Sequence, residues 1–289
     1  MFLIAILAVI IATISPFWGL IFILASGGKY QERIYIFFTV FSGIVVILSI
    51  ASIIDIITLS DLIVGVGATS LLFFWSLFRT FNYIRSMMAA FFFSIVYSAA
   101  RQLIFGKAFI ENVNQAIEQY KEFITSAFQN SAEQMNLALE ITESFKEIFT
   151  TFYAGIWVLT VVLALYFGSL LFSRKNIMKW KHRTIRMPFF LVYFLIAGLV
   201  LFLMPGTKNI GINSLLMLSP LFLIQGISIL DFYWGNFFKK SKFLLFLLIF
   251  SMVINYFILT LVALMGLLDI WFNFRKISIM EEMNESNLS

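Results

Sequence analysis

Six polar side chains are candidates for chemistry, because the sequence places them within or at the ends of long apolar segments. They are Gln225, Asn255, Asp231, Asp269, Arg85 and Arg101. A charge at the centre of a bilayer costs about 2.5–3.5 kcal/mol on insertion scales, so polar groups inside a membrane are functional candidates by default. We therefore predict that these six residues bind a substrate.

Each of the six also has a purely structural interpretation. Gln225 and Asn255 sit inside apolar segments and could simply hydrogen-bond neighbouring helices. The two arginines could extend toward the lipid headgroups, with their stems along apolar surface. The two aspartates stand at segment ends, where water could solvate them. The sequence alone leaves these alternatives open.

The segment from Asp269 to Arg275 holds an acid, a tryptophan and a base. On a straight helix, residues six apart point about 120° away from each other, so Asp269 and Arg275 could pair only across a bend. Trp271 is first of all a residue of the aromatic belt at a membrane interface.

Other chemistry is largely excluded by residue type. The chain has no cysteine, and its single histidine is His182, which excludes disulfides, thiolate catalysis and a histidine-rich metal site. No acid pair or nucleophile elbow is visible, so we expect no enzyme activity and no cofactor. The glycines of Gly65-Val66-Gly67 lie within an apolar span, which favours close helix packing over a nucleotide loop.

The apolar content of the chain predicts what positions these residues. Hydrophobic residues make up 61% of the sequence, charged residues 12%, and the mean hydropathy is +0.97, whereas a soluble domain carries about 25% charged residues. Lipid must therefore be the solvent for much of this surface. The apolar stretches are continuous, which favours helices over barrel strands. We predict an all-α, polytopic membrane protein with about seven to nine membrane helices.

Shifts in composition divide the chain into four parts. We predict an N-terminal transmembrane bundle over 1–106, an amphipathic insert over 107–149, a C-terminal transmembrane bundle over 150–276 and a polar, disordered tail over 277–289. Seven uninterrupted spans are expected over 34–54, 62–78, 87–100, 152–172, 188–204, 214–230 and 243–268. Pro16 interrupts the first 25 residues, so they read as one kinked span or two short helices, in preference to a cleaved signal peptide.

The insert has apolar residues at three-four spacing on either side of a polar stretch. Ser131 with Gln134 three residues later is a capping-box pattern, which predicts that a second helix begins there. We expect a helical hairpin, with one continuous helix as the alternative. The insert carries seven glutamates against Lys107, Lys121 and Lys146, so it is net acidic.

The basic residues predict an orientation. The densest basic run, Arg174 to Arg186, should be cytoplasmic. Counting spans from it places the acidic insert outside and Arg79 inside. Simple parity places Arg275 and Lys276 outside, against the rule. Either the last predicted span re-enters the membrane, or two positive charges are not decisive for the orientation of this end.

Two C-terminal motifs resemble the YybS-like family of uncharacterised bacterial polytopic membrane proteins. They are Gln225-Gly226 within Leu221–Leu230, and the run from Gly266 to Arg275. The N-terminal half is similar in pattern to substrate-binding subunits of energy-coupling-factor transporters and to the rod-shape protein MreD, with Pro16 before the glycine-bearing span of Gly43. The acidic insert departs from the compact transporter subunits. The resemblance implies no reaction.

These observations predict an integral protein of the bacterial cytoplasmic (inner) membrane. We expect a small-solute binding or transport-type subunit without its own ATPase, with the lipid bilayer and a small molecule as partners and no nucleic acid. The alternative is a membrane scaffold for envelope or division machinery, with residues 107–149 as the element that docks protein partners.

Overall fold

The computed structural model describes residues 1–27, 33–128, 131–173, 182–240 and 254–277. In these ranges every regular element is helical, so the predicted all-α class is confirmed. The predictions about the basic run over 174–181, the lysines at 239, 240 and 242, and the tail from residue 278 lie outside the described side chains.

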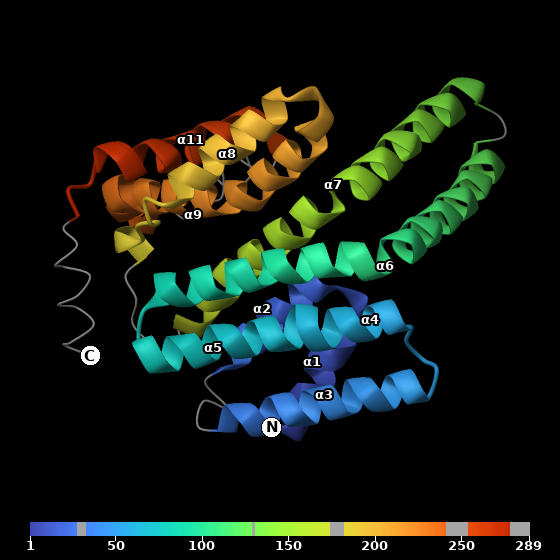
Figure 1. Cartoon of the computed structure of the whole chain (residues 1–289), viewed down its shortest axis with the longest axis horizontal. Coiled ribbons are helices and arrows are strands. Elements are labelled where there is room, and N and C mark those ends of the chain that lie inside the picture. The colour runs from blue at the N-terminus through green and yellow to red at the C-terminus, as the bar shows by residue number, and fades with distance from the viewer. Residues whose placement is uncertain (28–32, 129–130, 174–181, 241–253, 278–289) are drawn as a thin grey trace.

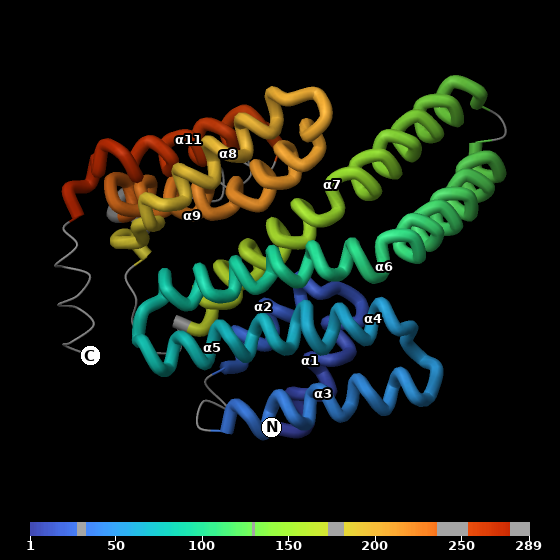
Figure 2. The backbone as a smooth tube through the Cα atoms, viewed as in Figure 1, coloured from blue at the N-terminus to red at the C-terminus, as the bar shows by residue number. Residues whose placement is uncertain are grey.

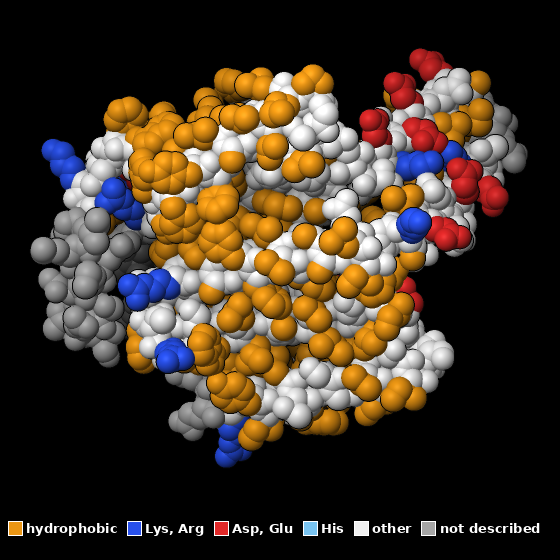
Figure 3. Space-filling view, viewed as in Figure 1, with side chains coloured by type: hydrophobic (Ala, Val, Ile, Leu, Met, Phe, Trp, Pro, Cys, Tyr) orange, Lys and Arg blue, Asp and Glu red, His pale blue; other side chains and the backbone are white. Residues whose placement is uncertain are grey.

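Several helices could cross a membrane by length and composition. In the described part of the chain, the four longest apolar segments are Ile56–Thr80, Tyr83–Ala127, Ala132–Phe172 and Pro205–Gly235, and five shorter apolar helices accompany them. Apolar side chains cover much of the face in Figure 3. Such a surface suits lipid contact, so the chain is a multi-pass membrane protein.

The first 26 residues form two short helices, α1 (Phe2–Ile14) and α2 (Pro16–Ser26). Pro16 starts α2, where its missing N–H costs nothing, and Ser15 before it is extended. At about 1.5 Å per residue, each helix is shorter than the bilayer core of about 30 Å. A Cβ at Gly19 would overlap Ala12, so the two helices are sharply bent against each other.

α3 (Ile34–Ile50) is the next helix. The span that follows it is assembled from three helical pieces. They are α4 (Ile56–Ser60), a π-helical stretch η3 (Asp61–Ala68) and α5 (Thr69–Thr80). The Asp55 side chain caps α4 by accepting the Thr58 N–H at 2.8 Å. A π-helical stretch is rare and often marks a functional position. Asp61 is its first residue.

The amphipathic insert is a hairpin, as predicted, made by α6 (Tyr83–Ala127) and α7 (Ala132–Ser173). The alternative of one continuous helix is wrong, because α6 ends before residues 129–130. The 45 residues of α6 extend about 68 Å, more than twice the bilayer core. The hairpin therefore continues two membrane helices outward without a break, and Figure 1 shows it projecting beyond the bundle.

The C-terminal half packs three helices side by side. They are α8 (Leu191–Leu203), α9 (Lys208–Lys240) and α11 (Tyr256–Phe272), with short 3₁₀ turns at η4 (His182–Thr184) and η5 (Pro205–Thr207). α9 is longer than the predicted span over 214–230 and includes Pro220. The tube in Figure 2 follows α8 and α9 antiparallel to each other through the turn at η5.

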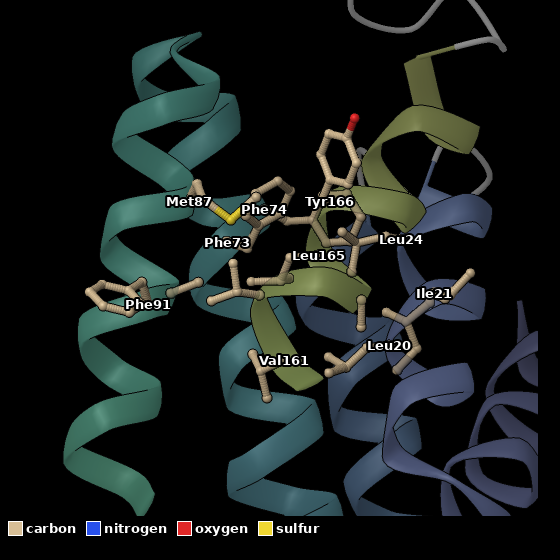
Figure 4. Close-up of a cluster of buried hydrophobic side chains, with 14 of the residues drawn as sticks. Leu20, Ile21, Leu24, Phe73, Phe74, Met87, Phe91, Val161, Leu165 and Tyr166 are labelled. Carbon is tan, nitrogen blue, oxygen red and sulfur yellow. The ribbon is translucent and has the colours of Figure 1, made fainter. Parts of the chain in front are cut away.

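The core joins the N-terminal helices to α7. Leu20 and Leu24 of α2, Phe74 of α5, Phe91 of α6 and Leu165 of α7 are fully or almost fully buried in one cluster, which Figure 4 shows at close range. Aromatic and branched side chains from four helices interlock there, so this part of the bundle is well packed.

Candidate functional site

The structure brings two of the six predicted residues, Gln225 and Asp269, into direct contact. They lie on α9 and α11, are fully buried, and are joined by a 2.9 Å hydrogen bond from Gln225 Nε2 to Asp269 Oδ2. Through Oε1, Gln225 also accepts the backbone N–H of Met187 at 2.7 Å. This one amide therefore links two helices to the segment that precedes α8.

Arg275 neutralises the buried carboxylate of Asp269. α11 ends at Phe272, and Asn273 then takes left-handed backbone angles (φ 44°, ψ 55°) that turn the chain back. Arg275 donates from Nη2 and Nε to Asp269 Oδ2 at 2.8 and 3.2 Å. The bend that a pair six residues apart requires is present. A water-exposed placement of Asp269 is wrong, because this side chain is 0% exposed.

The other donors of Arg275 bind the basic segment before α8. Nη1 donates to the Arg183 carbonyl at 2.8 Å, and Nη2 donates to the Ile185 carbonyl at 2.6 Å. Nη1 also donates to Ser228 Oγ at 2.6 Å. Arg275 thus lies at the same end of the bundle as Arg183, whereas simple parity places it on the opposite side of the membrane from the basic run.

Two glycines allow the contact between Gln225 and Asp269. A Cβ on Gly226 would overlap the Val262 carbonyl oxygen, and a Cβ on Gly266 would overlap the Phe222 carbonyl oxygen. The backbones of α9 and α11 therefore touch at this crossing, as small residues permit in membrane helices. The two sequence motifs that carry the family resemblance, 221–230 and 266–275, pack against each other here.

Asp231 lies on α9 beside the same segment and is one-third exposed. It contacts His182 Nδ1 at 3.1 Å and Arg183 Nε at 3.4 Å. His182 Nε2 lies 2.6 Å from the Tyr166 hydroxyl on α7. An ionised carboxylate can only accept, so His182 donates from Nδ1, and a neutral imidazole then accepts the Tyr166 hydroxyl at Nε2. These contacts tie α7 to α9.

We call these residues the basic-end network: Gln225, Asp269, Arg275, Ser228, His182, Arg183, Asp231 and Tyr166. Most of its polar groups have partners, and Asp269 Oδ1 is the network's buried side-chain atom without one among the described residues. A network with nearly all its donors and acceptors engaged braces helices. Within the described ranges, no three His, Asp or Glu side chains group in a way that could hold a metal ion.

A second buried ion pair lies toward the hairpin end and includes the predicted residue Arg101. Its guanidinium holds Asp61 by two bonds, from Nε to Oδ1 at 2.5 Å and from Nη2 to Oδ2 at 2.7 Å. Tyr97 adds a hydrogen bond of 2.6 Å from its hydroxyl to Asp61 Oδ1. Arg101 is 5% exposed, so the expectation that it extends to the lipid headgroups is wrong.

Aromatic rings enclose this guanidinium. Its Cζ lies 4.4 Å from the ring centroid of Tyr153, 5.0 Å from Phe109 and 5.5 Å from Trp157. Phe109 and Tyr153 also contact each other, with centroids 4.3 Å apart. Electron-rich ring faces stabilise a desolvated cation. We call Asp61, Tyr97, Arg101, Phe109, Tyr153 and Trp157 the hairpin-end cluster.

Three donors of the hairpin-end cluster are buried without a partner in the part of the chain that the structure describes. They are Arg101 Nη1, the Tyr153 hydroxyl and Trp157 Nε1. A buried unpaired donor costs about 1–3 kcal/mol, and most native proteins satisfy such groups. One of the three belongs to the guanidinium itself, and the other two belong to rings that enclose it.

The glycine pair beside this cluster serves packing, as predicted. A Cβ on Gly65 would meet the Trp157 and Tyr97 rings, and a Cβ on Gly67 would crowd the Leu62 carbonyl and Phe41. Glycine at 65 lets the Trp157 ring approach the π-helical stretch η3 closely. The sequence favoured this role over a nucleotide loop.

Two of the six predicted residues lie apart from both sites. Arg85 is exposed in the first turn of α6. Asn255 is exposed at the start of α11, where its side chain accepts the Phe257 N–H at 3.0 Å. Asn255 is therefore the N-cap of α11, at a break in the helix within the segment predicted as the last span.

Sequence reasoning missed most of the hairpin-end cluster. Asp61 falls between the predicted spans over 34–54 and 62–78, whereas in the structure it begins the π-helical stretch beside Arg101. The spacing of Tyr97 and Arg101, four residues apart, places both on one face of α6. This spacing is the feature of the sequence that could have indicated the cluster. Nothing in the sequence connected this face to Asp61, 40 residues away.

The outer part of the hairpin is acidic and exposed. Figure 3 shows Asp and Glu side chains gathered on it, with most Lys and Arg side chains at the opposite end. Lys121 Nζ bridges Glu118 and Glu143 at 2.8 and 2.5 Å. Its hydrogen bond lowers the pKa of the Glu143 carboxyl, so this pair is charged at neutral pH. The bridge fastens α6 to α7 outside the bundle.

Comparison with known proteins identifies one family. The model of a family described as predicted membrane protein (DUF2232) matches residues 1–270. The search of curated proteins finds no match, and neither does the search of solved structures. The matched range includes the hairpin and the Gln225–Asp269 contact, and it ends before Arg275.

Proposed function

This chain belongs to the DUF2232 family of predicted membrane proteins, and we propose that it is a small-solute binding or transport-type subunit of the bacterial cytoplasmic membrane. In this proposal it has no ATPase of its own, catalyses no reaction and works with partner subunits. A YybS-like identity, and the likeness to energy-coupling-factor substrate-binding subunits and MreD, belong to the same proposal.

The three unpaired donors of the hairpin-end cluster carry this proposal. Arg101 Nη1, the Tyr153 hydroxyl and Trp157 Nε1 are buried beside a neutralised ion pair. An acceptor oxygen of a solute would satisfy them and offset their desolvation. Because Asp61 already balances the charge of Arg101, the site suits a neutral acceptor, such as a carbonyl.

The same aromatic rings explain how a solute would be held. Phe109 and Tyr153 are in contact over the guanidinium of Arg101 at the base of the hairpin. A solute would enter when the Phe109 and Tyr153 rings separate. When the two rings come back into contact, they would exclude water. Closure of this kind strengthens each hydrogen bond to the solute, because the surroundings have a low dielectric constant.

The test removes one donor at a time and keeps an aromatic ring at each position. We expect native mass spectrometry of protein purified from its own membranes to detect a bound small molecule. Tyr153→Phe and Trp157→Phe should each lower its occupancy about tenfold or more, since each loses a hydrogen bond to a buried acceptor. Tyr193→Phe and Trp18→Phe, at exposed positions, are the matched controls and should retain the molecule.

Two results would contradict the solute proposal. One is wild-type protein that carries no small molecule. The other is equal occupancy in the site variants and the exposed-position controls. Melting temperatures of all four variants, measured without ligand, check that any loss of binding does not come from unfolding.

An exposed apolar surface on the hairpin favours the second candidate function, a membrane scaffold for envelope or division machinery. Leu137 and Phe145 of α7 are each more than half exposed, although they lie in the acidic part outside the bundle. If the scaffold function is correct, Leu137→Ser with Phe145→Ser should abolish the cellular function. The Tyr153→Phe variant should then leave that function intact.

A further inference from the structure

The outward face of α7 carries a continuous apolar stripe. Leu137, Ile141, Phe145 and Ile148 are 59%, 47%, 53% and 45% exposed. Their spacing of four, four and three residues keeps them within about 40° of one direction on the helix. The stripe extends about 17 Å, or three helical turns. It is an uncovered surface of the kind that marks interaction sites.

The hairpin does not need this stripe for its own packing. The buried residues that face the other helix are Ile124 on α6 and Thr142 on α7. Thr142 lies about 100° around the helix from Ile141, so the inner face and the stripe are distinct. Two further aromatic side chains, Tyr120 and Phe123 of α6, are also more than half exposed.

A row of glutamates flanks the stripe. Glu133, Glu140 and Glu147 are exposed and seven residues apart. On a helix this spacing aligns them in one row, about 100° from Ile141 on the side away from Thr142. With Ile141 and Ile148 at a and Leu137 at d of a heptad, the three glutamates occupy g. Charges at g select oppositely charged partners across a helix–helix seam.

We propose that this face of α7 docks an amphipathic helix of a partner protein, with an apolar seam and lysine or arginine beside it. Seven glutamates against three lysines over 107–149 give this segment a net charge of −4. That charge disfavours a second copy of the hairpin and an anionic lipid surface, and it attracts a basic helix. The proposal is independent of solute binding at the hairpin-end cluster.

The experiment uses the full chain in phosphatidylcholine nanodiscs and two designed helical peptides. Both have leucine at a and d, and they differ in carrying lysine or glutamate at e and g. We expect the lysine peptide to bind about tenfold more tightly than the glutamate peptide in fluorescence anisotropy, with affinity falling as salt rises. The triple variant Glu133→Lys, Glu140→Lys, Glu147→Lys should reverse the preference.

Matched variants distinguish binding at this face of α7 from attraction by the overall negative charge of the hairpin. Glu111→Lys with Glu122→Lys alters exposed acids on α6 and should leave the preference for the lysine peptide in place. Ile141→Glu should weaken both peptides. Empty nanodiscs measure binding to lipid alone.

The proposal is overturned if the lysine peptide binds no better than to empty nanodiscs, or if the triple variant keeps the wild-type preference. It is also overturned if a cysteine in place of Ser144, on the exposed outer side of α7, cross-links two copies of this chain in native membranes. That result would make a second copy the occupant.

Discussion

At the residue scale, the Asp269–Arg275 pair is the most consequential contact at the basic end. Both side chains are 0% exposed, and a buried charge that loses its partner costs about 3–5 kcal/mol, whereas replacing both charges by apolar groups can be neutral. We predict that Asp269→Leu and Arg275→Met each destabilise the protein by about that amount. The double variant should be less destabilised than either single variant.

Unfolding in mild detergent, followed by tryptophan fluorescence, measures this cycle. Lys276→Met is the control, because it removes a neighbouring exposed charge. Additive losses in the double variant would mean that the two side chains do not act as a pair.

The same residues show what a sequence reveals about a site. Gln225 and Asp269 were identified because polar groups inside apolar segments are rare. Their union with Arg275 depends on the left-handed turn at Asn273, and local spacing does not specify this turn. Arg101 was identified by the same reasoning, but its partner Asp61 comes from another helix. Solute binding by the six predicted residues remains a proposal.

At the element scale, the crossing of α9 and α11 depends on glycine. We predict that Gly266→Ala separates the helices and destabilises the protein by about 1–3 kcal/mol or more, because the added methyl group meets backbone atoms that cannot move aside. Gly206→Ala is the control, since a Cβ there has nothing within 4 Å. Thermal unfolding in detergent measures both variants.

The close crossing of α9 and α11 also supports the Gln225–Asp269 hydrogen bond. A second measurement can therefore test whether the two depend on each other. If Gly266→Ala weakens that bond, then adding Gln225→Leu should cost less in the Gly266→Ala background than in wild type. Equal costs in the two backgrounds would show that the crossing and the amide act independently.

Hydropathy predicted the helices, and the amphipathic pattern predicted the hairpin. Both depend on local sequence, since lipid requires each span to satisfy its own backbone. The boundaries predicted at residues 106 and 149 fall inside α6 and α7, because a helix can leave the membrane without ending. Side chains that hydrogen-bond to the backbone of a neighbouring helix could not be predicted from local sequence. Asn213 on α9, for example, accepts the Gly155 N–H at 2.8 Å and donates to the Thr151 carbonyl at 3.0 Å.

At the scale of the whole molecule, charge is divided between the two ends. The acidic hairpin projects from one end, and the described basic segment around Arg183 lies at the other, held to Arg275. Simple parity places Arg275 on the opposite side of the membrane from the basic run, whereas the structure bonds it to the carbonyls of Arg183 and Ile185. Hydrogen bonds between two segments constrain which side of the membrane they share more strongly than a count of spans does.

This arrangement predicts the accessibility of single cysteines, which is measurable because the chain has no cysteine of its own. A membrane-impermeant maleimide applied to intact cells should label Ser131→Cys at the hairpin tip. It should label Lys276→Cys and Lys179→Cys only after the membrane is permeabilised, since Arg275 is bonded to the basic segment that the positive-inside rule places in the cytoplasm. Labelling of Lys276→Cys without labelling of Lys179→Cys in intact cells would contradict the shared end. Labelling of both, with Ser131→Cys protected, would instead keep the fold and reverse its orientation.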